Sequence, residues 1–158
     1  MKKICIATFI ALLGLVLFAG CSYSGEFKST EVKEADCNIG DKDKAKVGYG
    51  FDVTKQEAGE LVITSNADYS QFAIPLPYSG FKKAEVEFTT TGKTTVGFLA
   101  AGSVPWASRI TGADAYEDTP IKDETKTYNI PDGAGFITFG SNGATGVKIT
   151  IKKITIKM

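Results

Sequence analysis

The sequence contains no histidine, one arginine, one tryptophan and three cysteines in 158 residues. The lack of histidine removes the usual general base, metal ligand and nucleophile-activating side chain at once. The sequence also has no P-loop, no Cys/His spacing of a metal site and no nucleophile elbow. We therefore expect neither an enzyme nor a cofactor.

An excess of charge of either sign is also missing, because 18 Lys and Arg residues balance 18 Asp and Glu residues. Loss of Lys2 and Lys3 with the leader described below leaves 16 basic residues against 18 acidic ones. Phosphate binding needs a basic excess or stripe, so nucleic acid is not expected as the main partner. A chain of this length forms one domain with a core that needs no metal or disulfide.

The longest apolar run lies at the N-terminus, where the basic pair Lys2-Lys3 precedes residues 4–17. The run is too short to span a bilayer comfortably and is typical of a cleaved secretory signal helix, here residues 1–20. Its ending, Leu-Phe-Ala-Gly-Cys, resembles a bacterial lipobox. The resemblance implies that fatty acyl chains such as palmitate on Cys21 anchor an exported lipoprotein to a membrane of the cell envelope or surface. The alternative is an ordinary signal peptide with a chance cysteine.

Residues 21–46 are polar and rich in Lys, Glu, Asp and Ser, a composition that favours a flexible tether. One early strand is expected near residues 30–33. Cys37 lies in this segment, and it is either a small, partly buried side chain or the partner in an intermolecular disulfide.

From Val47 onwards, short stretches alternate apolar and polar side chains, as half-buried strands do. About eight such strands and no helical periodicity predict an all-β antiparallel sandwich of jelly-roll type over residues 47–158. The predicted strands are 47–53, 60–64, 71–76, 83–91, 94–101, 125–130, 136–139 and 147–156.

The alternating faces also predict the core and one irregularity. Phe72, Phe88, Tyr128 and Phe139 fall on apolar faces and are expected inside. In the last strand, Ile151 and Ile154 are three residues apart, so both face the core only if the strand has a bulge at Lys152-Lys153 or turns a corner there.

Residues 102–124 show no alternation and are longer than most structureless loops, so we expect this stretch to be functional or internally packed. The stretch holds the single tryptophan, Trp106, and the single arginine, Arg109, together with Asp114 and Tyr116.

The order of the segments resembles the jelly-roll carbohydrate-binding modules attached to bacterial xylanases and glucanases. Residues 48–50, 68–77 and 80–86 are similar to the front half, and residues 126–130, 136–142 and 147–156 to the back half. The resemblance implies non-catalytic binding of a glycan or polysaccharide. Many such modules hold a structural calcium, but the closing strand here has lysines where an acid would be expected, so no metal site is predicted although Asp36, Asp41, Asp43 and Asp52 offer oxygen atoms.

Sugar binding needs flat aromatic rings for stacking and polar groups for the hydroxyls, and both are found in or beside the predicted loops. The candidate binding residues are Trp106, Tyr116, Tyr69 and Tyr78, with Arg109, Asp114, Gln71 and Asn142 as polar partners. Trp106 has an alternative role as a plug that covers one open end of the sandwich.

Two other functions stay open. A structural or adhesive surface lipoprotein would use the loops to bind a protein partner. A glycosidase would need two carboxyl groups across a substrate, for which Glu85 with Glu87, or Glu117 with Asp118, has suitable spacing. Charged outer faces of antiparallel sheets are common, so we favour solvated acids.

Overall fold

The computed structural model describes residues 32–158, which form eleven β-strands and no helix. Within this range no helix is long and apolar enough to cross a membrane. The signal peptide and Cys21 lie outside the described residues. The strands are β1 (Glu34–Asp36), β2 (Lys46–Tyr49), β3 (Phe51–Glu57), β4 (Glu60–Ser65), β5 (Gln71–Pro75), β6 (Lys83–Thr90), β7 (Thr94–Ala100), β8 (Ala115–Glu117), β9 (Glu124–Asn129), β10 (Ala134–Ser141) and β11 (Lys148–Lys157).

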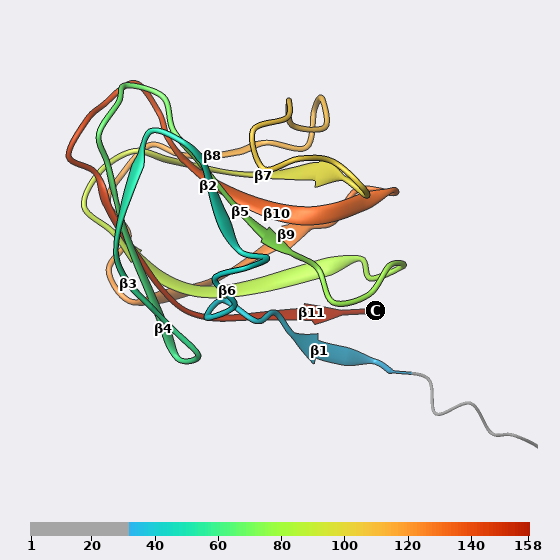
Figure 1. The fold of residues 1–158 in the computed structure, drawn as a ribbon. Coiled ribbons are helices and arrows are strands. Elements are labelled where there is room, and N and C mark those ends of the chain that lie inside the picture. The colour runs from blue at the N-terminus through green and yellow to red at the C-terminus, as the bar shows by residue number, and fades with distance from the viewer. Residues whose placement is uncertain (1–31) are drawn as a thin grey trace, which may run out of the picture. The chain divides into compact units, whose positions relative to one another are not determined.

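The strands form two stacked sheets, shown in Figure 1. The first sheet has the order β3-β4-β11-β6-β9, with β1 paired to the far half of β11, and the second has the order β2-β5-β10-β7-β8. Every neighbouring pair is antiparallel. The predicted all-β antiparallel sandwich is therefore confirmed.

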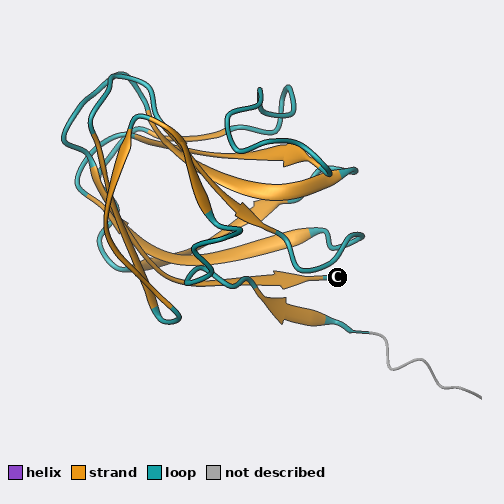
Figure 2. Ribbon diagram, in the orientation of Figure 1, coloured by secondary structure: helices purple, strands orange, loops and turns teal. Residues whose placement is uncertain are grey.

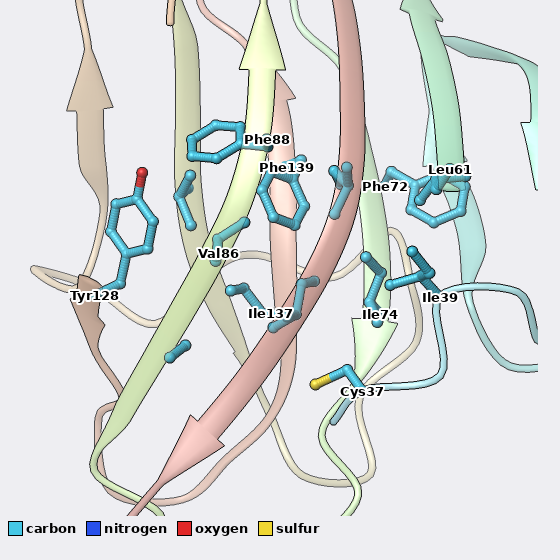
Figure 3. Close-up of a cluster of buried hydrophobic side chains, with 14 of the residues drawn as sticks. Cys37, Ile39, Leu61, Phe72, Ile74, Val86, Phe88, Tyr128, Ile137 and Phe139 are labelled. Atoms are coloured by element: carbon cyan, nitrogen blue, oxygen red, sulfur yellow. The ribbon is translucent and has the colours of Figure 1, made fainter. Parts of the chain in front are cut away.

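The core lies between the inner faces of the two sheets and is rich in aromatic side chains (Figure 3). Phe72, Phe88 and Phe139 are fully buried and Tyr128 is 6% exposed, as predicted. Phe88 makes an edge contact with Phe139 at 5.9 Å between ring centroids and a tilted contact with Tyr128 at 6.4 Å. Such pairs add about 0.5–1.5 kcal/mol beyond the burial of area.

The bulge predicted in the last strand is present. Ile151 pairs with Phe88 and Lys153 pairs with Glu87, so Lys152 is the extra residue. The shift returns Ile154 to the core side, where it is 1% exposed.

One predicted strand is wrong, because residues 47–53 form two strands in different sheets. The backbone turns at Gly50, which has φ = 66°, a left-handed conformation that side chains with a Cβ rarely adopt. The strand β2 joins the second sheet and β3 joins the first, so Tyr49 is 43% exposed whereas Phe51 is buried. A continuous apolar alternation across the corner hid the change of sheet.

The sandwich also begins earlier than the predicted boundary at residue 47, and the second half of the predicted tether, from residue 34 onwards, is part of it. The strand β1 pairs with β11, and the Cys37 amide donates to Ile154 O at 2.9 Å. Ile39 and Cys37 are buried, and the Gln56 side-chain amide donates to Ala45 O at 2.9 Å. Burial raises the pKa of the Cys37 thiol to about 12, so an intermolecular disulfide through it is not supported.

Candidate functional site

The outer face of the second sheet carries a transverse row of positions that crosses all five strands. The register pairs Tyr49 with Gln71, Gly140 with Thr95, and Thr95 with Tyr116. Gly140 also lies one step beyond the Phe139–Phe72 pair, which places it beside Gln71. Neighbouring strands lie about 4.8 Å apart, so Tyr49 and Tyr116 flank a floor roughly 19 Å wide.

The loop between β7 and β8, residues 101–114, lies over this face, and Figure 2 draws it in teal on the side of the second sheet that faces away from the first. The Gln71 side-chain amide donates to Pro105 O at 2.7 Å and to Ala107 O at 3.0 Å. The Ile110 amide donates to Phe98 O at 2.7 Å. Gln71 is 2% exposed, so it supports the loop from below.

Arg109 and Asp114 lie above Gly97 of β7, in the middle of the covered face. Their Nη1 and Oδ2 atoms are 3.5 Å apart, and the two side chains are 20% and 23% exposed. A Cβ at residue 97 would collide with Asp114 Oδ1 and Arg109 Cδ, so only glycine leaves room for the pair. Next to them, Thr138 pairs in register with Gly97. Arg109 Nη1, Asp114 Oδ1 and Thr138 Oγ1 are buried and have no hydrogen-bond partner among the described residues.

The long loop and the row beneath it enclose a cleft of about 460 Å³, here called the polar hollow. Trp106, Tyr116 and Tyr49 stand at its rim and are 63%, 60% and 43% exposed. The alternative role of Trp106, as a plug over an open end of the sandwich, is therefore wrong, because the ring is exposed. Donor and acceptor groups line the hollow between the rings and belong to Gln71, Ser108, Arg109, Thr111 and Asp114.

A second hollow, of about 410 Å³, shares Trp106 with the polar hollow and is here called the apolar hollow. Pro75, Pro105, Trp106 and Phe136 form its apolar wall, and Asp43, Lys44 and Lys46 complete its lining. Phe136 also lines a further hollow beside Tyr78.

Five of the eight predicted binding residues line the polar hollow: Trp106, Tyr116, Arg109, Asp114 and Gln71. The other three lie elsewhere on the same sheet or its loops. Tyr69 and Asn142 form an isolated bridge beyond the ends of β5 and β10. Tyr78 follows β5 and packs against Phe81, with ring centroids 6.2 Å apart.

Sequence reasoning missed Tyr49, Phe136 and Lys46. Tyr49 lies in the predicted strand 47–53, where it shares the alternation of Val47, Phe51 and Val53 and so did not stand out as a loop residue. The glycine between two apolar strand segments was the available signal for a corner. Phe136 and Lys46 come next to Trp106 only through the strand register, which cannot be read from the sequence.

The carboxyl pairs considered for hydrolysis are held by cations. On the first sheet, Glu85 accepts from Lys157 at 2.6 Å, and Glu87 lies 3.9 Å from Lys152 Nζ. Glu117 accepts from Lys126 at 2.6 Å and from the Tyr128 hydroxyl at 2.9 Å, which ties β8 of one sheet to β9 of the other.

The protonation of Tyr128 and the distribution of acidic side chains bear on what this part of the molecule can bind. Burial and the bond to Glu117 raise the pKa of the Tyr128 hydroxyl above its ordinary range, so it stays a neutral donor. Among residues 32–158 no group of three or more His, Cys, Asp or Glu side chains could hold a metal ion.

No protein-family model matches the sequence, and no curated protein does either. Solved structures of carbohydrate-binding modules match the fold. A family 29 module variant complexed with mannohexaose has a TM-score of 0.61 at 11% identity, over 78% of this chain and 89% of that one. A variant complexed with cellulohexaose has a TM-score of 0.58 at 10% identity, over 79% and 92%.

A third solved structure is a low-affinity xylan-binding module of family 86 from Roseburia intestinalis. Its TM-score is 0.55 at 15% identity, over 79% of this chain and 93% of that one. The chain has the β-sandwich fold of carbohydrate-binding modules. At these identities the similarity establishes the fold alone.

Proposed function

We propose that this protein binds a glycan or polysaccharide, without catalysis, through the polar hollow on the outer face of its second sheet. The observation that carries the proposal is the exposure of Trp106, Tyr116 and Tyr49 around one cleft whose lining is polar. Exposed rings provide stacking faces for the C–H side of a sugar, and the groups between them bind hydroxyls.

The Arg109–Asp114 pair suits a neutral sugar. A guanidinium only donates hydrogen bonds and a carboxylate only accepts them, so together they can bind the oxygen of one hydroxyl and the proton of its neighbour. Their separation of 3.5 Å is long for a direct hydrogen bond and the side chains are 20% and 23% exposed, so their exposed atoms keep donor and acceptor capacity for a ligand.

The solved structures of the same fold support this choice. Two of them are described as complexes with mannohexaose and cellulohexaose, and a third as a xylan-binding module. We propose a polysaccharide with sugar units of this neutral kind as the ligand class.

We also propose that the protein is anchored to a membrane by a lipid on Cys21. Acylation of Cys21 would hold the protein at a bacterial envelope membrane or cell surface, with the sandwich presented to a glycan outside. Metabolic labelling with a palmitate analogue tests this part: incorporation that is lost in Cys21→Ser supports the anchor, and equal labelling of both chains contradicts it.

Isothermal titration of the purified chain with xylan, β-glucan and mannan oligosaccharides tests binding. Heat that saturates with one of them and is lost in Trp106→Ala supports the proposal. The alternative is a surface lipoprotein that binds a protein. It would be favoured if no titration produced heat and if a protein were captured stoichiometrically in a way that depends on Trp106, Tyr116 and Tyr49. Release of reducing ends that disappears in Glu87→Gln would contradict the non-catalytic role.

A further inference from the structure

The apolar hollow beside Trp106 differs in chemistry from the polar hollow, although the two share this ring. Pro75, Pro105 and Phe136 offer no side-chain hydrogen-bonding group, whereas the polar hollow contains a guanidinium, a carboxylate and hydroxyls. A ligand that stacks on Trp106 can therefore reach the hydrogen-bonding groups of the polar hollow and the apolar wall of the second hollow, whose lining is completed by the charged residues Asp43, Lys44 and Lys46.

An unsubstituted sugar fits the apolar side poorly. Sugar rings carry hydroxyls on most of their carbons, and a hydroxyl moved from water against Pro75, Pro105 or Phe136 loses its hydrogen bonds without replacement. A methyl group in the same place gains from leaving water. The hollow therefore selects a ligand with an apolar group close to the stacked sugar.

The lining of this hollow contains one cation without a partner. Lys44 lies 3.8 Å from Asp41, whereas Lys46 has no ion pair within the described part of the chain. Lys46 pairs in register with Ala73 on β5, on the covered face of the second sheet. Its ammonium can donate to an oxygen held above the apolar wall.

We propose that the apolar hollow binds an acyl substituent, of the acetyl type, carried by the sugar chain. The methyl packs on Phe136, Pro75 and Pro105, and the carbonyl oxygen accepts from Lys46. The ligand class is thus an acylated polysaccharide. This inference rests on the proposed function, because the polar hollow binds the sugar that carries the substituent.

The test uses the full chain and two preparations of one oligosaccharide series, one O-acetylated and one deacetylated by mild alkali. Titration is expected to show the acetylated series bound at least about four-fold more tightly, which corresponds to about 0.8 kcal/mol for one buried methyl. Lys46→Ala and Phe136→Ala should remove this preference. Tyr116→Ala, at the rim of the polar hollow, should weaken both series by the same factor.

Lys46 is exposed, so its substitution keeps the test valid even if Phe136→Ala affects folding. Equal affinity for both series, both weakened by Trp106→Ala, would overturn the acyl site and leave the proposed function standing. Binding of neither series would overturn both. Preference for a uronic acid series that is lost in Lys46→Ala would overturn the acyl site in favour of a carboxylate site.

Discussion

The outer faces of the two sheets differ in the side chains that they expose to water. The first sheet presents Lys, Glu and Thr side chains, and its Lys and Glu residues form cross-strand ion pairs such as Lys157–Glu85. The second sheet and its loops carry all the exposed aromatic side chains of residues 32–158: Tyr49, Tyr69, Tyr78, Trp106 and Tyr116.

A strand face exposed to water needs only polar side chains to stay soluble, as the first sheet shows. Rings exposed together favour association with something outside the chain, and contiguous apolar patches on soluble proteins mark binding sites. The contrast supports the proposed site on the outer face of the second sheet.

The largest effect on binding is expected from removing Trp106, the ring that lines both hollows. Trp106→Ala should weaken glycan binding by about 1–3 kcal/mol, the range for loss of one stacking ring. Because Trp106 is 63% exposed, unfolding should change by less than about 0.5 kcal/mol. Titration and denaturant unfolding measure the two quantities. Thr127→Ala on the first sheet is the control, and an equal loss of affinity there would break the contrast between the faces.

Substitution of Gln71, which supports the loop, should lower the stability clearly and weaken binding less than the loss of Trp106 does. Gln71→Met keeps the size of the side chain but removes both hydrogen bonds to the loop, so two partly buried carbonyls lose their donor. Unfolding free energy should fall by about 1–3 kcal/mol. Calorimetry checks it, and an unchanged melting temperature would show that the Ile110–Phe98 bond is enough to hold the loop.

Breaking an ion pair on the first sheet should have little effect. Glu85→Gln removes the partner of Lys157, and exposed pairs of this kind contribute little because water and salt screen them. The melting temperature should fall by only about 1–2 °C at low salt, with no difference in 1 M NaCl. Glycan affinity should stay the same, and a loss of affinity would place part of the site on this face.

The smallest effect is expected from pH at the edge of the first sheet. The hydrogen bond from the Thr155 hydroxyl at 2.6 Å, with the nearby Lys153, holds the pKa of Asp36 below its ordinary value of 3.8. The native state thus favours the carboxylate, and its contribution to stability is present above pH 3.8 and is lost as pH falls through the lower folded pKa. Unfolding curves at pH 6 and pH 3 should show a slightly smaller acid loss in Asp36→Asn, and an identical loss would contradict the assignment.

Much of the sandwich could be predicted from the sequence because strands with one buried face alternate visibly. The bulge at Lys152 was predictable because it breaks that alternation by one residue. The segment around Cys37 and Ile39 was not, because its few apolar residues stand among charges and are buried only by pairing with β11.

The candidate site also contains residues that could be predicted from the sequence and residues that could not. Trp106, Arg109, Asp114 and Tyr116 are neighbours in one loop, so composition alone drew attention to them. Lys46 and Phe136 reach the same place from other strands, and only the register of five strands brings them together.

The long loop connects β7 and β8, which are consecutive antiparallel strands at the edge of their sheet. Its length can change without disturbing strand order, and closing a longer loop adds little entropic penalty. Loops of other lengths and sequences could therefore connect Ala100 to Ala115 on the same two strands, so the residues that line the polar hollow could be replaced without rebuilding the sandwich.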